Sequence, residues 1–457
     1  MKRLVLPMVA CLAAGCGNLI PAYERPAPPV AASFPDAGTA SGPAAATLPW
    51  RDFVVDARQR ALVERALENN RDLRVAVLNV EQARAALGVQ RADQWPTVGA
   101  GINATRTPVG NSAVTSYTAG LSVSAFELDL FGRVRSLGEA AAARYLASQE
   151  GQRAAQVSLI AAVVSADLAL RADDELLQVT QGTLQSREEG LRLTRVKFDG
   201  GAAAEPELRA AESLVAAARV SLVALQRQRA QDLNALVLLL GQPMPEGLPT
   251  GGPLETLAFA ELPAGLPSEV LLQRPDVRQA EQQLIAANAT IGAARAAFFP
   301  RISLTGSAGF ASTELSGLFE NSAWSFTGQL LQPLFDAGRN QGNLASARAG
   351  RDIAVAQYEK TVQTAFREVA DALAGRATLS QQLAAQQAQA EAETRRLQLA
   401  ELLYRGGVAS QLDRLDAERA SLAARQAVVQ VRAAQLQNAV LLYRVLGGGT
   451  AGATIAP

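Results

Sequence analysis

The sequence predicts a mainly α-helical protein with transmembrane β-strands, built from two copies of one helix–strand–strand–long helix–helix unit. Three observations predict this fold class: an internal repeat, four alternating segments of about ten residues and two proline-free stretches of about 60 residues. A length of 457 residues would otherwise suggest two or three independent globular domains. The repeat replaces that expectation with two copies of one unit.

The composition excludes several kinds of chemistry. The chain has no histidine and two cysteines, and its 43 basic residues balance 43 acidic residues. Without histidine there is no Ser-His-Asp or Cys-His nucleophile, no histidine-ligated metal and no imidazole base near neutral pH. The balanced charge provides no positive field for nucleic acid. Paired carboxylates could still serve an enzyme, but the composition favours a scaffold or conduit, and we expect no catalytic residue, cofactor or metal and no nucleic-acid partner.

The amino terminus predicts export. Lys2 and Arg3 precede an apolar run, residues 4–14, that is too short to span a bilayer as a helix. Residues 1–15 are therefore predicted to be a signal peptide. The end of this segment resembles a bacterial lipoprotein signal, which implies that Cys16 becomes the lipidated first residue. The alternative is that Cys16 is an ordinary small residue at a cleavage site.

Residues 16–50 are predicted to be a lipidated extended tether, because they are rich in proline and alanine and lack a core of their own. Gly17 follows the cysteine, whereas lipoproteins retained at the inner membrane have an aspartate there. The sequence at this position therefore resembles that of lipoproteins sorted to the outer membrane. After the signal no run of 18 apolar residues is present, so we expect no membrane-spanning helix.

An internal repeat organises the rest of the chain. A shift of 204 residues aligns the two halves up to Phe131 and Phe335, and a shift of 206 aligns them afterwards. We divide the chain into a first repeat (51–241), an inter-repeat segment rich in proline and glycine (242–267), a second repeat (268–447) and a flexible tail (448–457). The matched residues include Arg74/Arg278, Gly88/Gly292, Arg91/Arg295, Trp95/Phe299, Pro96/Pro300, Arg133/Arg339, Gly201/Gly407, Glu212/Glu418 and Gly241/Gly447.

Each repeat contains two segments in which apolar residues alternate with small polar ones. These segments have the length and the pattern of transmembrane β-strands. Half of a soluble sheet is the alternative, but two such hairpins at equivalent positions of an exported chain favour the membrane. The predicted strands are about 97–107, 116–127, 300–311 and 322–332.

Four strands cannot close a barrel, and a sheet with open edges is not tolerated in lipid. Several chains must therefore contribute strands to one barrel. A dimer would supply eight strands and a trimer twelve.

The helices that follow are unusually long. No proline occurs from about residue 133 to 196 or from about 338 to 404, and 60 helical residues extend about 90 Å. The next helix has a heptad seam that includes Leu415 and Leu436, and a second stripe of small residues lies opposite it. Two apolar faces favour a stave in a hollow cylinder over a solid bundle or a coiled-coil filament. A charged line, Glu418, Arg425 and Arg432, is predicted to face water.

The most specific motifs lie around the start of the second repeat and at the helix–strand junctions. The chain is identified by them as similar to TolC-like outer-membrane efflux proteins, and within that family to the OprM/NodT-type lipoprotein branch. The motifs are Leu266-Pro267-Ser268, Arg274-Pro275-Asp276-Val277-Arg278, Ala294-Arg295-Ala296-Ala297-Phe298-Phe299-Pro300, Glu127-Leu128-Asp129-Leu130-Phe131-Gly132-Arg133 and Gln332-Pro333-Leu334-Phe335-Asp336-Ala337-Gly338-Arg339.

The resemblance implies a homotrimer with a 12-stranded β-barrel in the outer-membrane lipid on a periplasmic α-helical barrel. It implies the passive exit channel of a tripartite pump, which conducts drugs or other toxic small molecules. The partners would be a periplasmic adaptor (membrane-fusion) protein and an inner-membrane transporter of the resistance-nodulation-division (RND) class. A channel for type I protein secretion is the alternative, and a purely structural spacer would not need the four strands.

The resemblance also places functional residues at a closed periplasmic aperture. The positions carried over are Asp413, Asp416 and Tyr404, with Glu207 in the first repeat. Three copies of such carboxylates around one axis would attract cations and hold a narrow entrance. The alternative for Asp413 is an acidic cap at a helix amino terminus. Ala409 stands where the family often has a charged residue.

Overall fold

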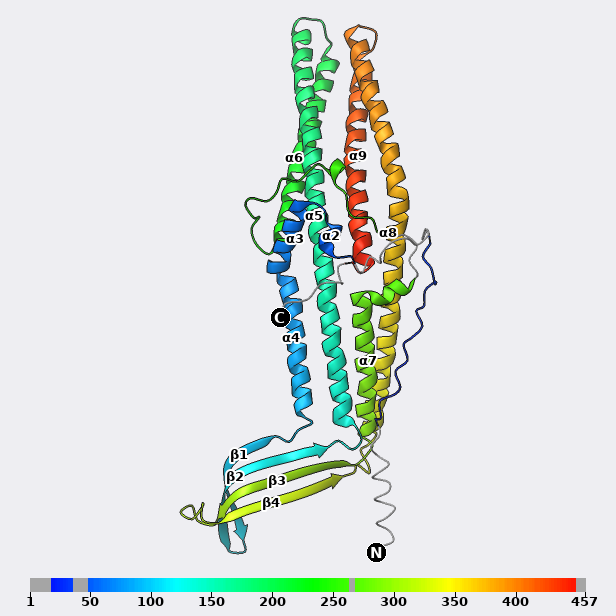
Figure 1. Ribbon diagram of the computed structural model, residues 1–457. Coiled ribbons are helices and arrows are strands. Elements are labelled where there is room, and N and C mark those ends of the chain that lie inside the picture. The colour runs from blue at the N-terminus through cyan, green and yellow to red at the C-terminus, as the bar shows by residue number, and fades with distance from the viewer. Residues whose placement is uncertain (1–17, 36–47, 263–267, 449–457) are drawn as a thin grey trace. The chain divides into compact units, whose positions relative to one another are not determined.

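The computed structural model describes residues 18–35, 48–262 and 268–448, and Cys16 lies outside this part (Figure 1). Each repeat contains a helix followed by two strands and two long helices, and this order occurs twice. The elements are α2 (Trp50–Phe53), α3 (Ala57–Asn69), α4 (Arg71–Ala92), β1 (Val98–Val109), β2 (Ser112–Leu128), α5 (Arg133–Asp199), α6 (Glu205–Leu240), the 3-10 helices η2 (Leu254–Thr256) and η3 (Ser268–Gln273), α7 (Pro275–Ala296), β3 (Arg301–Ser312), β4 (Ser322–Leu331), α8 (Arg339–Arg405) and α9 (Gln411–Val445).

The chain divides into two compact units, each assembled from three stretches of sequence. We call the first the strand unit; its described residues fall within 1–28, 77–151 and 278–361. We call the other the helical unit; its described residues fall within 29–76, 152–277 and 362–457. Both units contain parts of both repeats, so the repeats are interleaved and are not separate domains.

The strand unit contains one antiparallel sheet with the order β1-β2-β3-β4 (Figure 1). A two-residue turn joins β1 to β2, and Gly110 adopts the positive φ of 61° that such a turn requires. β2 therefore begins at Ser112, before the predicted start near residue 116. The two repeats join through the pairing of β2 with β3, which continues across a β-bulge between Val123 and Phe126.

The β2–β3 ladder contains a close approach that only glycine permits. Gly120 lies opposite Gly309, and a Cβ added to Gly309 would lie 2.1 Å from the carbonyl oxygen of Ala119. No side chain can occupy that space, because real Cβ atoms do not approach a carbonyl oxygen so closely. The paired glycines let the backbones of β2 and β3 approach closely at this point of the sheet.

The long helices α5 and α8 each contain 67 residues, which corresponds to about 100 Å of helix. Among the described residues, α5 alone is long and apolar enough to cross a membrane. Half of its most apolar stretch is buried within the protein, as in the core helix of a soluble protein, so this observation is weak evidence for a membrane span.

An aromatic stack forms part of the core of the helical unit. The ring of Phe53 lies between Phe259 and Tyr443, with ring centroids 5.0 Å and 4.0 Å away. The Tyr443 hydroxyl donates a hydrogen bond to the carbonyl of Leu48 at 2.8 Å. This stack joins the amino-terminal segment, the inter-repeat segment and α9, which are distant in sequence.

Arginine side chains hold the inter-repeat segment through its backbone carbonyls. The guanidinium of Arg432 on α9 donates to the carbonyls of Leu254, Glu255 and Leu257 at 2.7–3.1 Å. Arg171 on α5 donates to Gly252 at 3.0 Å in the same way. These backbone contacts fix the segment together with its side chains, which include the buried Leu254 and the stacked Phe259.

The prediction that the charged line of α9 faces water is wrong at two of its three positions. Glu418 is buried, and Arg432 is half-buried against the inter-repeat segment, whereas Arg425 is exposed. The heptad spacing places the three residues on one face of α9. It could not show that other segments cover part of that face.

Replacement of Arg432 by alanine should loosen the inter-repeat segment. Three backbone carbonyls lose their donor, and carbonyls left unsatisfied cost about 1–3 kcal/mol. Arg425→Ala is the matched control, because Arg425 lies seven residues earlier on the same face and is exposed. Limited proteolysis should cut the variant faster than the wild type between residues 250 and 262, and equal cutting of both variants would contradict the clamp.

Candidate functional site

Each repeat forms a helical hairpin whose turn has the same backbone geometry. Gly201 follows α5 with φ 74°, and Gly407 follows α8 with φ 75°, a conformation that glycine adopts without strain. The amide of Ala202 donates to the carbonyl of Lys197 in the first turn, and the amide of Val408 donates to Leu403 in the second. The two tips are therefore equivalent in backbone, and their differences lie in the side chains.

Asp413 lies in the first turn of α9, where it forms a reciprocal capping box with Ser410. The Ser410 hydroxyl accepts from the Asp413 amide at 3.2 Å, and the Asp413 carboxylate accepts from the Ser410 amide at 3.0 Å. Hydrogen bonds from the Ser410 side chain and backbone lower the pKa of this carboxyl below its usual range. The exposed carboxylate of Asp413 therefore both caps α9 and stays charged at neutral pH.

Asp416 and Glu207 have different surroundings. Asp416 is partly exposed and pairs with Arg419 one turn further along α9. Glu207 is exposed in the first turn of α6, and its carboxylate makes no ion pair with another described residue. Asp413 and Asp416 therefore lie near the start of α9 in the second hairpin, and Glu207 lies near the start of α6 in the first.

Tyr404 lies at the contact between the two hairpins, near the end of α8. Lys197 at the end of α5 donates to its hydroxyl at 3.3 Å, and the Lys197 ammonium lies 5.1 Å from the ring centroid. The Arg414 guanidinium lies 5.6 Å from the same centroid. These side chains line a cavity of about 360 Å³ with three cations, Lys197, Arg405 and Arg414, and one carboxylate, Glu401.

A buried ion network ties α5 to α6 and α9 beside this cavity. The Arg187 guanidinium donates to the Glu418 carboxylate at 2.8 Å and to the Leu214 carbonyl at 3.2 Å. Arg414 approaches the second oxygen of Glu418 at 3.6 Å. Glu418 is 8% exposed, so its charge is largely removed from water and depends on both arginines.

The equivalent carboxylate of the first repeat has a different role. Glu212 matches Glu418 at the 206-residue shift, yet its pairs with Arg195 and Arg209, both at 2.9 Å, are exposed on the first hairpin. The duplication therefore keeps the glutamate but uses it between hairpins in one repeat and within a hairpin in the other.

The structure places the residues predicted for the site at the hairpin tips, but it joins only Tyr404 to the other hairpin. Lys197, Arg187, Arg414 and Glu418 are the contacts that the sequence analysis missed. For Glu418, the sequence offered one signal of a buried contact, because this charged residue lies within the apolar pattern of α9. Among the described residues, no group of carboxylates or cysteines could hold a metal ion.

A duplicated chain with two long helical hairpins and an open-edged antiparallel sheet is the fold of TolC-like outer-membrane channels. The family model for outer membrane efflux proteins matches residues 62–242 and 266–448. The chain therefore belongs to the outer membrane efflux protein family.

The chain aligns with its relatives over nearly its full length. The chain is 46% identical to the solvent efflux pump outer membrane protein SrpC of Pseudomonas putida, over 92% of each protein. It is 44% identical to OprJ of Pseudomonas aeruginosa, over 97% of this chain and 95% of that protein. The open-state MtrE outer membrane channel of Neisseria gonorrhoeae matches with a TM-score of 0.88 and 41% identity, over 95% of this chain and 99% of that one.

These findings define the protein as an efflux channel of the outer membrane with the TolC-like fold. The predicted family, fold class, efflux function and location are confirmed. The alternative of protein secretion is not favoured. The family is one of outer membrane efflux proteins, and the solved relative MtrE is an outer membrane channel.

Removal of the buried carboxylate should separate the two hairpins. Glu418→Ala leaves Arg187 buried without its partner, which typically costs about 3–5 kcal/mol. Glu212→Ala is the matched control from the first repeat, and its exposed pairs should matter far less. Denaturant unfolding in detergent, followed by helical circular dichroism, measures both.

The double variant Arg187→Met/Glu418→Leu distinguishes a lost charge pair from a lost side chain. Apolar residues of similar size often replace a buried ion pair without loss of stability. We expect this variant to recover most of the stability that Glu418→Ala loses. Equal stability of Glu418→Ala and Glu212→Ala would contradict the importance of the network.

Proposed function

We propose that three copies of this chain close a 12-stranded barrel in the outer membrane, and that their helices form a tunnel into the periplasm. The channel is the passive exit of a tripartite pump, together with a periplasmic adaptor and an inner-membrane RND transporter. One observation carries the proposal: the sheet order β1-β2-β3-β4 leaves the outer edges of β1 and β4 without a strand partner among the described residues. In lipid those edges require strands from other copies.

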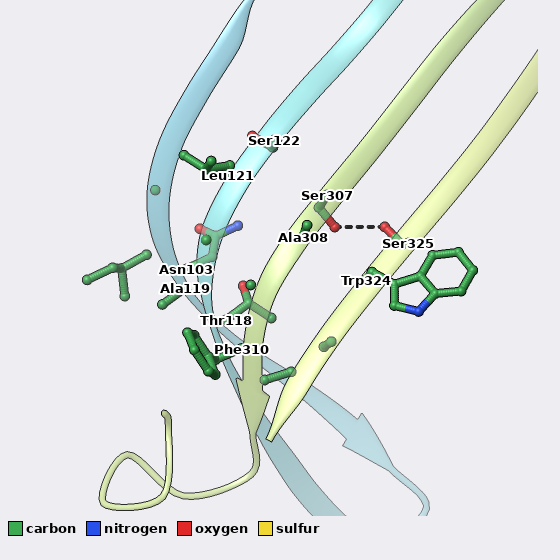
Figure 2. A pocket seen from close by; sticks show the side chains of 16 residues that line it. Asn103, Thr118, Ala119, Leu121, Ser122, Ser307, Ala308, Phe310, Trp324 and Ser325 are labelled. Atoms are coloured by element: carbon green, nitrogen blue, oxygen red, sulfur yellow. Dashed lines mark hydrogen bonds between the residues drawn. The ribbon is translucent and has the colours of Figure 1, made fainter. Parts of the chain in front are cut away.

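The two faces of the sheet support this arrangement. Ser122, Ser307 and Ser325 lie opposite one another on neighbouring strands, and Ser307 and Ser325 share a hydrogen bond of 2.8 Å (Figure 2). The adjacent row on the other face contains Leu121, Ala308 and Trp324. One face therefore suits a water-filled lumen and the other suits lipid.

The cargo that we propose is small and largely apolar. Similar proteins are named for the efflux of solvent, toluene and antibiotics. A sheet face of serine, threonine and glycine offers such molecules no strong binding site, which suits passive conduction. Energy and selectivity would then reside in the transporter.

We place the entrance at the hairpin tips, with Asp413, Asp416, Tyr404 and Glu207 as its functional residues. In a three-fold ring each carboxylate is repeated three times around the axis, and such rings attract cations. Tyr404 supports this assignment because it contacts Lys197 of the other hairpin.

Conductance across a planar bilayer tests the channel and its entrance. The wild-type protein should conduct with a preference for cations. Asp413→Asn combined with Asp416→Asn should lower that preference and raise the single-channel conductance, because it removes six charges from a trimer. Glu393→Gln is the control, since Glu393 lies on α8 and pairs with Arg396 away from the tip.

The possible results separate the two claims. Absence of conductance in both the wild type and the double variant would exclude the channel. Conductance with unchanged ion preference in the double variant would exclude Asp413 and Asp416 from the entrance while leaving the channel intact.

We also propose that Cys16 carries a lipid that anchors the mature chain, as its position after the apolar run 4–14 suggests. Cys16→Ser should abolish labelling with radioactive palmitate and reduce the protein recovered in outer-membrane fractions. Cys11→Ser is the control, because Cys11 lies inside the apolar run. Palmitate labelling of Cys16→Ser would refute the assignment.

A further inference from the structure

The loop between β3 and β4, residues 313–321, is folded back on the strand that precedes it. The amide of Ala311 on β3 donates to the carbonyl of Asn321 at 3.1 Å, which brings the two ends of the loop together. Within the loop, the amide of Leu318 donates to the carbonyl of Leu315, and the Leu318 side chain is 4% exposed. The loop is therefore a compact turn with a buried side chain of its own.

The ring of Phe319 shows over which face of the sheet this loop folds. Phe319 packs edge-on against Phe310 of β3, with ring centroids 5.5 Å apart and ring planes at 72° (Figure 2 shows the Phe310 ring pointing toward the loop). Phe310 points to the same face as Ala308, because side chains two residues apart on a strand share a face. That face also carries Leu121 and Trp324 and is the one that suits lipid. The loop therefore folds over the outer face of the sheet.

Beside the loop, β2 is covered on its outer face and open on the other. Tyr117 is half-buried and Ala119 is 7% exposed, and both point outward, opposite Ser312 and Phe310 of β3. Thr118 lies between them, points to the face that suits the lumen and is exposed. This difference agrees with a loop that folds outward and leaves the lumen face free.

The loop begins where the apolar outer face of β3 ends. From Ile302 to Ser312 the strand rises about 33 Å, and at the usual tilt of about 35–45° this corresponds to a height of about 25 Å. The apolar band of an outer-membrane barrel has the same height of about 25 Å. Since Phe319 contacts Phe310, the loop returns from the upper limit of this band to a row within it.

Arg106 marks the same limit on β1. It lies opposite Thr115, in the next outward-facing row beyond Tyr117 and Ser312. An arginine on the outer face at this level can place its guanidinium among the lipid headgroups. The hairpin of β1 and β2 thus continues past the apolar band, whereas the loop turns back at its boundary.

We propose that the loop 313–321 is a membrane anchor, in which the side chains of Leu315 and Phe319 enter the acyl chains of the outer leaflet. The two side chains are 64% and 66% exposed within the chain, although the loop folds on an apolar face. The irregular backbone of the loop stays at the boundary of the apolar band, because hydrocarbon does not satisfy its amides and carbonyls. The inference rests on the proposed barrel in the outer membrane and deepens it.

Acyl chains are the occupant that the surroundings of the loop favour. The outer face continues from the loop toward the base of the sheet with Trp324 and Phe326, which are 82% and 66% exposed and uncharged. The carboxylates of the loop, Glu314 and Glu320, lie next to its apolar side chains in sequence and remain among the headgroups. A loop held in this way cannot act as a lid over the outer opening of the channel.

Spin labelling of single cysteines tests the anchor in protein reconstituted into dioleoylphosphatidylcholine vesicles. A nitroxide on Phe319→Cys or on Leu315→Cys should collide more often with oxygen, which concentrates among acyl chains, than with a water-soluble nickel chelate. Thr118→Cys is the matched control on the lumen face and should show the opposite preference. The mature wild-type chain, in which Cys16 is the one cysteine, provides the background spectrum.

The two loop positions protect the test against a loop that opens. Leu315→Cys leaves the contact between Phe310 and Phe319 intact, so it reports on the folded loop even if Phe319→Cys releases it. Preferential collision with the nickel chelate at both loop positions would place the loop in water and overturn the anchor. Protection from both reagents at both positions would place protein over the loop, and this result would overturn the lipid contact as well.

Conductance separates an anchor from a lid, and this inference from the proposed function. A bulky thiol reagent on Phe319→Cys should leave the single-channel conductance unchanged, whereas the same reagent on Thr118→Cys should lower it. Block of the channel by the reagent on Phe319→Cys would overturn the anchor. If the wild type conducts while the loop labels meet the nickel chelate, the anchor is wrong and the channel stands; if the wild type does not conduct, the proposed function itself fails.

Discussion

An unpaired strand edge is the constraint on which the rest of this structure depends. Backbone amides and carbonyls at such an edge find no water in hydrocarbon, and each unsatisfied group costs several kcal/mol. Among the residues that the structure describes, one chain forms three ladders between four strands, so β1 and β4 remain edges. The chain can satisfy them only with strands from further copies. Its helices must then be arranged around a shared axis, and α9, for which the sequence predicts two apolar faces, suits that arrangement.

Duplication gives the chain pairs of equivalent side chains, and the two members of a pair can have different surroundings. Glu212 and Glu418 occupy equivalent positions, but one pairs on the surface of its hairpin and the other is buried between hairpins. Phe131 is stacked, whereas its counterpart Phe335 is exposed. A single sequence unit therefore meets two environments: one neighbour is the other repeat of the same chain, and the other neighbour must come from outside it.

The sequence predicted those features that depend on local pattern. The alternation of β3 and β4 and the proline-free helices can be recognised in consecutive residues, and the repeat shows each of these patterns twice. Side-chain contacts between elements were not predictable in this way. Arg187 and Glu418 are 231 positions apart, and nothing in either helix specifies that the guanidinium and the carboxylate meet. The carbonyl clamp of Arg432 was missed because its acceptors are backbone atoms, which have no sequence signature.

The buried network of Arg187, Glu418 and Arg414 is better explained by its effect on the alignment of the two hairpins along each other than by its effect on stability. Desolvation of two arginines and a carboxylate offsets most of their attraction, so an apolar cluster would hold the hairpins as firmly. The faces around it, however, are rich in alanine: Ala417 and Ala424 are both buried on α9. Small side chains can pack at several neighbouring positions along a helix with similar contacts. A charge that is satisfied only when Arg187 lies opposite Glu418 penalises every shifted arrangement, because each shift leaves a buried ion without its partner. The network therefore selects one alignment of the two hairpins, and that alignment sets the positions of Tyr404 and Lys197 at the tip.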